Sequence, residues 1–341
     1  MSSAPPLAEI AVLGALAATP SGLDANELVS VLADVGVGAE DALSACEALV
    51  ARGCLSIRGS GLELLPRGGA ELLGVHAAIE RALDPSPSTP GMEECPSVPW
   101  LTTVRTEWHD ALSLNYAVRP EALAALLPAP LEPEIFHGSA WVQVLCSRLR
   151  EMRPQGVPAL FGVDFHQVSY RAAVRYTGKH GARRGGYFVR SETDHAVMRA
   201  VGNALVEFKF HDFEAARVSL SKKGSELTFV SSPEAPLGET RAVLDVSPGQ
   251  GAGPTSVWSS RDDLRAALVE CYDAFGVDPG GYVYVLTIDR DPWREVFARP
   301  LAVSVPWMER GPLAGARLDS ALHIPLPCRY RWRPLRRERL G

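Results

Sequence analysis

The sequence GGYFVRSETDHAVMRAVGNALVEFKFH, residues 185–211, decides how the rest of the chain is interpreted. Its first ten residues are rich in aromatic and β-branched side chains and predict a strand. Apolar residues then recur at helical spacing through DHAVMRAVGNALVEF, which predicts a helix that runs into a second strand. This second strand, VEFKF, places one of the chain's four lysines, Lys209, between two phenylalanines.

Working outward, alternating patterns dominate the chain after residue 100. WLTTVRTEWHDALSLNYAV, residues 100–118, is interpreted as paired strands, and further strands are expected over 139–152, 164–176, 216–230 and 281–293. Helices are expected over residues 120–130 and 261–276. Many strands with few helices predict an α+β domain built on an antiparallel, closed sheet over residues 100–334.

The first 83 residues have a different pattern. Helical periodicity covers residues 7–18, 25–36 and 39–53, a β-hairpin is predicted around Gly59-Ser60-Gly61, and a further helix is predicted over 70–83. This order is typical of a small winged-helix-like domain. Residues 84–99 are rich in proline and serine and are predicted to be a linker, and residues 335–341 are predicted to be a basic tail.

Charge argues against DNA binding by the N-terminal module. Residues 1–85 carry eleven acidic side chains and only four arginines. The third predicted helix, which would enter the major groove, offers Glu40, Asp41 and Glu47 against Arg52. Since nucleic-acid affinity depends largely on cations that meet phosphates, we expect no nucleic-acid partner and favour protein contact or structural support.

Composition sets the compartment. The chain has 341 residues, 46% of them hydrophobic and 22% charged, which is ordinary for a globular protein. The first residues lack a basic region, no apolar run is long enough to span a membrane, and the six cysteines are scattered. We therefore expect a cytoplasmic protein with free thiols and no membrane partner.

Several of these segments resemble acetoacetate decarboxylases. NYAVRPEALAALLPAPLE, residues 115–132, is similar to their entry segment, and residues 185–211 are similar to their central strand–helix–strand segment. GSAWVQVL, REMRPQGVP and QVSYRAAV are more similar to a bacterial sister family of unknown function in the same superfamily. The resemblance covers about residues 100–334 and implies a cone-shaped, closed β-barrel with a buried cavity.

In acetoacetate decarboxylases a cavity lysine forms an imine with a β-keto acid, and a second lysine lowers its pKa. The same register here places Phe210 in the nucleophile's slot and His211 in the helper's slot. Because strand side chains alternate, Lys209 is expected to point away from the cavity, on the opposite face from Phe210. A Schiff-base lysine is therefore not expected.

The resemblance places other residues at the remaining site positions. The family's two strand glutamates fall on Gln143 and Gln167, and its arginine falls near His109. Arg190 and Glu192 share one face of their strand, which is compatible with an inward pair or with a surface ion pair. We take His109 as the candidate proton carrier, since its ordinary pKa is near neutral, with Gln143, Gln167, Arg190, Glu192 and Phe210 as ligand-binding candidates. No metal or cofactor motif is present.

These observations favour a small-molecule cavity protein that binds or converts a small oxo or hydroxy metabolite without imine chemistry. If it is an enzyme, isomerisation, dehydration or cyclisation fits this site. The alternative is a ligand-responsive winged-helix transcription regulator with the barrel as sensor. A third interpretation is structural, with the acidic N-terminal module docked on a basic surface, such as the arginine-rich residues 329–341, within one chain or across a homo-oligomer.

Overall fold

The computed structural model describes most of the chain after residue 104 and part of what precedes it. The described residues are 9, 12–13, 16, 23–33, 39–58, 61–65, 93–94, 104–154, 162–179, 181–196, 198–199, 203, 212–234, 238–278, 280–332 and 336–340. Among these residues, no helix has both the length and the apolar character needed to cross a membrane.

In the described residues, the N-terminal unit consists of a small sheet, two helices, and Glu9, Val12, Leu13 and Leu16, which are also helical. Its elements are β1 (Leu23–Asp24), α2 (Ala25–Ala33), α3 (Ala39–Ala51), β2 (Leu55–Arg58) and β3 (Gly61–Leu64). The strands pair in the order β1-β3-β2, and β2 and β3 form the predicted hairpin. Their core contains Leu28, Leu32, Leu49 and Cys54, all almost fully buried.

The predicted helices over residues 25–36 and 39–53 agree with α2 and α3. The predicted helix over residues 70–83 lies outside the described residues, so the winged-helix assignment stays a prediction. On α3, the acidic Glu40 and Asp41 lie in the first turn and are exposed.

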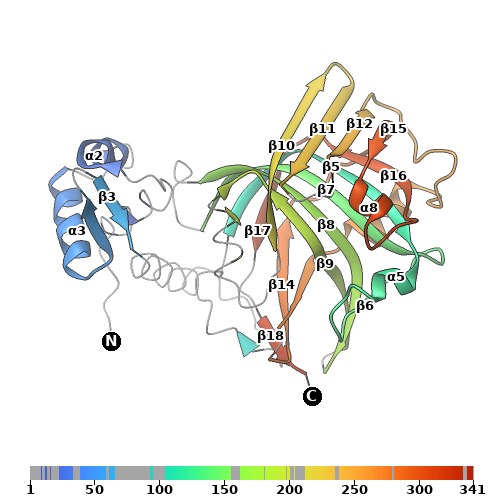
Figure 1. Ribbon diagram of the computed structural model, residues 1–341, viewed down its shortest axis with the longest axis horizontal. Coiled ribbons are helices and arrows are strands. Elements are labelled where there is room, and N and C mark those ends of the chain that lie inside the picture. The colour runs from blue at the N-terminus through green and yellow to red at the C-terminus, as the bar shows by residue number, and fades with distance from the viewer. Residues whose placement is uncertain are drawn as a thin grey trace.

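The rest of the described chain forms one large, mixed α+β unit dominated by a 15-stranded sheet (Figure 1). Its strands are β4 (Glu93–Glu94), β5 (Val104–Val118), β6 (Glu132–Pro133), β7 (Ala140–Pro154), β8 (Val163–Gly178), β9 (Gly181–Thr193), β10 (Phe213–Lys223), β11 (Glu226–Pro233), β12 (Thr240–Asp245), β13 (Asp273–Val277), β14 (Tyr282–Arg290), β15 (Val296–Ser304), β16 (Arg317–Ile324), β17 (Cys328–Trp332) and β18 (Arg336–Arg339). The helical segments are α5 (Pro120–Ala124), α7 (Arg261–Leu264), the π-helical turn η2 (Arg265–Val269) and α8 (Pro306–Arg310).

The strand pairings close two rings that share four long strands. Strands β5, β7, β8 and β9 pair consecutively and lie side by side (Figure 1). One ring returns from β9 to β5 through β13, β14 and β17. The other returns through β10, β11, β12, β15 and β16. The pairs β9–β10 and β9–β13 are parallel, so the sheet is not purely antiparallel as predicted.

The two faces of the shared strands contribute to different cores. Leu114, Val144 and Val168 belong to the larger hydrophobic cluster, which β11 and β12 complete. Their strand neighbours on the other face, such as Leu145 and Ala173, belong to a second cluster that includes residues of α7 and η2. Because successive side chains point to opposite faces, each shared strand is buried on both sides.

Two predictions about elements are wrong. Residues 104–118 are one strand, β5, and not paired strands; its register shifts between His109 and Leu112, at Asp110 with φ 47°. The helix expected over residues 261–276 ends at Val269, and Asp273–Val277 is strand β13, because Phe275 gains burial by pairing beside β14.

The predicted linker and the predicted basic tail each contain a short strand. Arg336–Arg339, expected in the basic tail, form β18, which pairs with β14. On its other edge Arg336 and Arg337 pair with Glu94 and Glu93. These two glutamates form β4 within the predicted linker.

Candidate functional site

A buried ion pair lies among the apolar side chains of the larger core. Arg190 Nε donates to Glu192 Oε1 at 2.9 Å, and the two side chains are only 6% and 1% exposed. Removing two charges from water is costly unless their geometry and hydrogen bonding are good. The pair is therefore a feature of the core that requires an explanation.

Hydroxyl groups surround the Glu192 carboxylate. Ser231 donates to Glu192 Oε2 at 2.5 Å, and the Tyr170 hydroxyl lies 3.4 Å from Oε1. The Tyr170 hydroxyl also lies 3.2 Å from Thr240 Oγ1. Burial raises the pKa of Tyr170, and the Glu192 charge raises it further. Tyr170 is therefore a neutral hydrogen-bond donor at ordinary pH.

A second carboxylate connects this network with solvent. Arg190 Nη2 donates to Glu214 Oε2 at 2.6 Å, and the Glu214 side chain is 41% exposed. Burial raises the pKa of Glu214, and Glu192 and Asp212 raise it further, against the lowering effect of Arg190. The Arg190 guanidinium thus lies between a fixed, buried carboxylate and a partly exposed one whose affinity for protons is increased.

The pairing of β9 explains why these groups meet. The β8–β9 register shifts between Tyr170 and Arg171, so that Tyr170 lies opposite Arg190 while Arg171 lies opposite Phe188. By simple alternation Phe188 and Arg190 would share a face of β9, but the shift puts them on opposite faces. Glu192 then lies beside Glu214, because β9 pairs in parallel with β10 at this height.

The remaining predicted residues are divided between two faces of the sheet. Gln143 lies on the face opposite to Arg190, where its amide donates to Ser113 at 3.1 Å and to Asn115 at 3.0 Å. Asn115 also donates to Ser320 at 3.1 Å, and Arg171 donates to the Gln143 carbonyl. Gln143 is therefore part of a second buried polar network, and it does not contact the Arg190–Glu192 pair.

The structure brings neither Gln167 nor His109 into contact with these two networks. Gln167 donates to Ser169 at 2.5 Å. His109 lies on β5 with Nε2 3.1 Å from Glu107 Oε2, and its side chain is 22% exposed. Its role as proton carrier stays a prediction.

Phe210, Lys209 and His211 lie outside the described residues, so the parity argument for Lys209 stays a prediction. The three described lysines, Lys179, Lys222 and Lys223, are exposed. No group of three His, Cys, Asp or Glu side chains in the described part of the chain could hold a metal ion.

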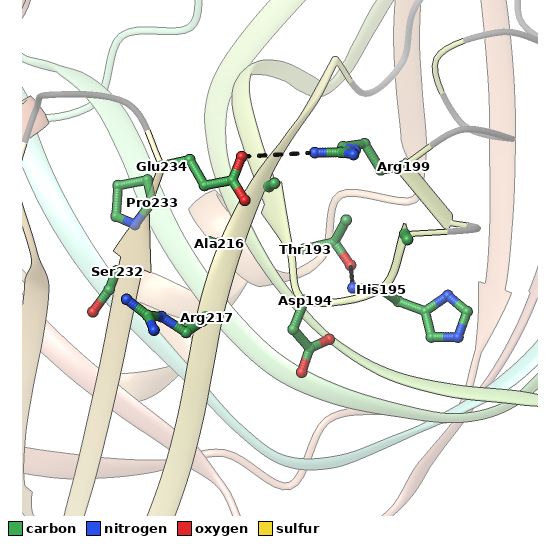
Figure 2. A pocket seen from close by; sticks show the side chains of 11 residues that line it. Thr193, Asp194, His195, Arg199, Ala216, Arg217, Ser232, Pro233 and Glu234 are labelled. Atoms are coloured by element: carbon green, nitrogen blue, oxygen red, sulfur yellow. Dashed lines mark hydrogen bonds and ion pairs between the residues drawn. The ribbon is translucent and has the colours of Figure 1, made fainter.

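A pocket lies where β9 ends, beside the start of β10 and the end of β11 (Figure 2). Its volume is about 550 Å³, and it is lined by Thr193, Asp194, His195, Ala196, Arg199, Ala215, Ala216, Arg217, Ser232, Pro233 and Glu234. Arg199 faces Glu234 across it at 4.0 Å. Thr193, Ala215 and Ser232 directly follow Glu192, Glu214 and Ser231 in the chain, so the pocket shares its strands with the buried network.

Sequence reasoning missed four members of the network: Tyr170, Glu214, Ser231 and Thr240. A signal existed for Tyr170, since its hydroxyl interrupts the apolar face that Val168 and Ala172 form on β8. The other three are brought into the network only by the pairings of β10, β11 and β12, which no local pattern reveals.

Several solved structures are similar to this chain at low identity. An acetoacetate decarboxylase-like enzyme from Sphingomonas wittichii RW1 matches with TM-score 0.48 and 14% identity, over 70% of this chain and 94% of the other. Acetoacetate decarboxylase from Legionella pneumophila matches with TM-score 0.46 and 13% identity, over 76% and 92%. The enduracididine biosynthesis enzyme MppR, complexed with a condensation product of pyruvate, matches with TM-score 0.46 and 14% identity, over 72% and 95%.

Sequence comparison gives the family. Uncharacterized protein YqjF of Bacillus subtilis (strain 168) is 32% identical over 129 residues, which are 38% of this chain and 50% of YqjF. The chain thus spans about half the length of this curated relative. A family model described as an uncharacterized conserved protein matches residues 105–317. This confirms the resemblance to a family of unknown function, and the chain belongs to that family, DUF2071.

Proposed function

We propose that this protein binds a small oxo or hydroxy metabolite at the Arg190–Glu192–Glu214 network. If it is an enzyme, it converts the metabolite by proton transfer, as an isomerase, dehydratase or cyclase does, without a lysine imine. The single observation that carries the proposal is the Arg190 guanidinium held between two carboxylates of unequal exposure.

The two carboxylates are suited to different roles. Glu192 is held by Arg190, Ser231 and Tyr170, so it serves as a fixed charge. Glu214 has a raised pKa and a path to solvent, which suits a residue that accepts and returns a proton. Pairs of titratable groups whose surroundings separate their proton affinities are a recurrent sign of acid–base sites. Arg190 would bind the oxygen on which negative charge develops.

Imine chemistry is not required by this arrangement. The lysines in the described part of the chain are exposed on the surface and take no part in the buried network. The register of the sequence places Phe210 where the nucleophilic lysine stands in acetoacetate decarboxylases. Arg190 would play the part that a protonated imine plays in acetoacetate decarboxylases. Its guanidinium stabilises the negative charge on an enolate oxygen without forming a covalent bond.

The test is hydrogen–deuterium exchange at the carbon beside the carbonyl, followed by NMR in D2O with a panel of 2-oxo and 3-oxo acids. Glu214→Gln should slow exchange by about 100-fold or more, which is the usual contribution of a positioned base. Glu132→Gln is the matched control, since Glu132 also accepts from an arginine, Arg175, but on the surface. The control should leave the rate unchanged.

Two results would contradict the proposal. One is a borohydride-trapped adduct on any lysine, located by mass spectrometry, because it would restore imine chemistry. The other is exchange that Glu214→Gln leaves unaltered. The regulator alternative gains no support from α3, where exposed acidic side chains oppose contact with phosphates.

A further inference from the structure

Three arginines bind three successive carbonyl groups at the end of the α7–η2 helical segment. Arg184 donates to the Ala267 carbonyl at 2.9 Å, Arg171 donates to the Leu268 carbonyl at 2.8 Å, and Arg290 donates to the Val269 carbonyl. They come from β9, β8 and β14. Cations near the end of a helix satisfy its last carbonyls and complement its dipole, so one arginine at this position would be ordinary.

The positive charge here exceeds what the surrounding groups neutralise. Among the described residues, Arg184 pairs with Glu134 at 3.3 Å, but neither Arg171 nor Arg290 contacts a carboxylate. A helix end offers only about half a negative charge. The carboxylates that flank Arg290 are engaged elsewhere: Asp289 pairs with Arg331 and Asp291 pairs with Arg329, each at 3.0 Å.

The two guanidinium groups without a carboxylate partner in the described chain both lie near one aromatic ring, that of Trp293. Arg290 lies over the Trp293 ring at 4.6 Å, and Arg171 lies 6.0 Å from the same ring. Burial lowers the pKa of Arg171, and Arg290 lowers it further, against the raising effects of Cys271 and Tyr330. Since arginine keeps its proton in proteins, this unfavourable environment calls for a counter-charge rather than deprotonation.

Arg290 itself is only half-buried, so this side of the cluster lies near the surface. Arg290 stacks on Tyr272 at 4.9 Å, and Tyr272 is 42% exposed. Beside Arg171, the Gln143 amide adds a neutral polar group on the same face. A planar guanidinium fork matches a carboxylate with two parallel hydrogen bonds.

We propose that a small carboxylate anion binds between Arg171 and Arg290, beneath the end of η2. Gln143 holds Arg171 in place, and Trp293 and Tyr272 hold Arg290. This site is separate from the Arg190–Glu192–Glu214 network, because Arg171 and Gln143 lie on the opposite face of the shared strands.

Titration of the full chain with oxalate tests the site, with neutral oxamide as the isosteric comparator and sodium chloride to match ionic strength. Calorimetry and thermal unfolding both report binding. Oxalate should bind and raise Tm, and oxamide should do neither. Arg171→Gln and Arg290→Gln should each weaken oxalate binding by about tenfold or more, the loss typical of one charge-assisted hydrogen bond. Arg184→Gln is the matched control, because it removes the same kind of carbonyl contact from an arginine that already has a carboxylate partner.

Two results would contradict the proposal and leave the arginines as no more than helix caps. One is that oxalate leaves Tm unchanged, and the other is that Arg184→Gln weakens oxalate binding as much as Arg171→Gln and Arg290→Gln do. Should Arg171→Gln fail to fold, Arg290→Gln and Arg290→Lys decide the matter: the lysine keeps the charge and should retain part of the affinity, whereas the glutamine should not. Glu214→Gln should leave oxalate binding intact, which separates this site from the proposed acid–base site.

Discussion

Arg190 and Glu192, two residues apart on β9, form an ion pair in which neither side chain is more than 6% exposed. A pair this deep contributes little net stability by itself, because desolvation offsets the attraction. Its value lies in what it orients: Glu192 accepts from Tyr170 and Ser231, and Arg190 donates to Glu214.

Breaking this pair should be far more costly than breaking a surface pair. Arg190→Ala leaves Glu192 buried and without its cation, so the free energy of unfolding should fall by about 3–5 kcal/mol. Arg175→Ala, which removes the exposed partner of Glu132, should cost less than about 1 kcal/mol. Urea unfolding of the two variants measures both values. Equal losses would show that Glu192 is solvated or paired otherwise.

Gly186 leaves room for the Arg171 side chain to pack against β9. A Cβ at this position would lie 2.6 Å from Arg171 Cδ and 2.8 Å from its Cγ, so Gly186→Ala should displace that side chain and cost about 1–3 kcal/mol. Gly251→Ala is the control, because a Cβ there meets no atom within 4 Å. Chemical denaturation should separate the two variants. If both prove neutral, Arg171 has another conformation available.

His323 should make stability fall in mildly acidic solution. It is 2% exposed, its Nε2 has no partner among the described residues, and burial, aided by Lys222 and opposed by Asp110, lowers its pKa. The unfolded chain, with an ordinary histidine pKa of about 6.5, then binds a proton more readily than the folded chain. This contribution is therefore complete above pH 6.5 and decreases as the pH falls through 6.5 toward the folded pKa.

Thermal unfolding between pH 7.5 and pH 5 checks the role of His323. His323→Leu should flatten the decline of Tm over this interval. Val296 is the cross-strand partner of His323, and Val296→Ala shortens its side chain by two carbon atoms. This control variant should lower Tm by a similar amount at every pH. A slope that His323→Leu leaves unchanged would assign the pH dependence to other groups.

The last residues of the chain should be needed for stability. Arg336–Arg339 pair with Val285–Tyr282 on β14, and Glu338, 6% exposed, accepts from the Lys179 backbone amide at 2.7 Å. Deleting residues 336–341 would leave that edge of β14 without its partner, and lost ladder bonds of about 0.5–1.5 kcal/mol each imply a loss on the order of 2–5 kcal/mol. Limited proteolysis and urea unfolding should show this, while the exposed Arg339→Gln should behave like the parent. Unchanged protease resistance after the deletion would show that these residues do not stabilise the sheet.

Much of the fold could be predicted from the sequence because local patterns carry it. Alternation predicted β7, β8 and β14, and helical periodicity predicted α2 and α3. The errors arose where a long-range interaction decides: residues 273–277 look helical by periodicity, yet pairing with β14 makes them a strand. Long β5 was divided in two because its register shift at Asp110 interrupts the alternation.

The site was less predictable for a related reason. Arg190 and Glu192 could be proposed as an inward pair from alternation within one strand. Glu214, Ser231 and Thr240 could not be predicted. They join the network through pairings between segments that are far apart in the chain. Gln143 was assigned to the same site as Arg190, but the parity of β7 and β8 puts it on the opposite face, with Arg171.

The four shared strands, β5, β7, β8 and β9, should tolerate insertions less well than the hairpin turns do. Inserting one residue into β8 between Ser169 and Tyr170 would exchange its two sets of side chains, so that one core would receive the polar groups of the other. Length variation in such a strand therefore damages both rings in a single step. At the Gly224 turn, which a φ of 61° and empty surroundings mark as an open hairpin end, the same insertion would disturb neither.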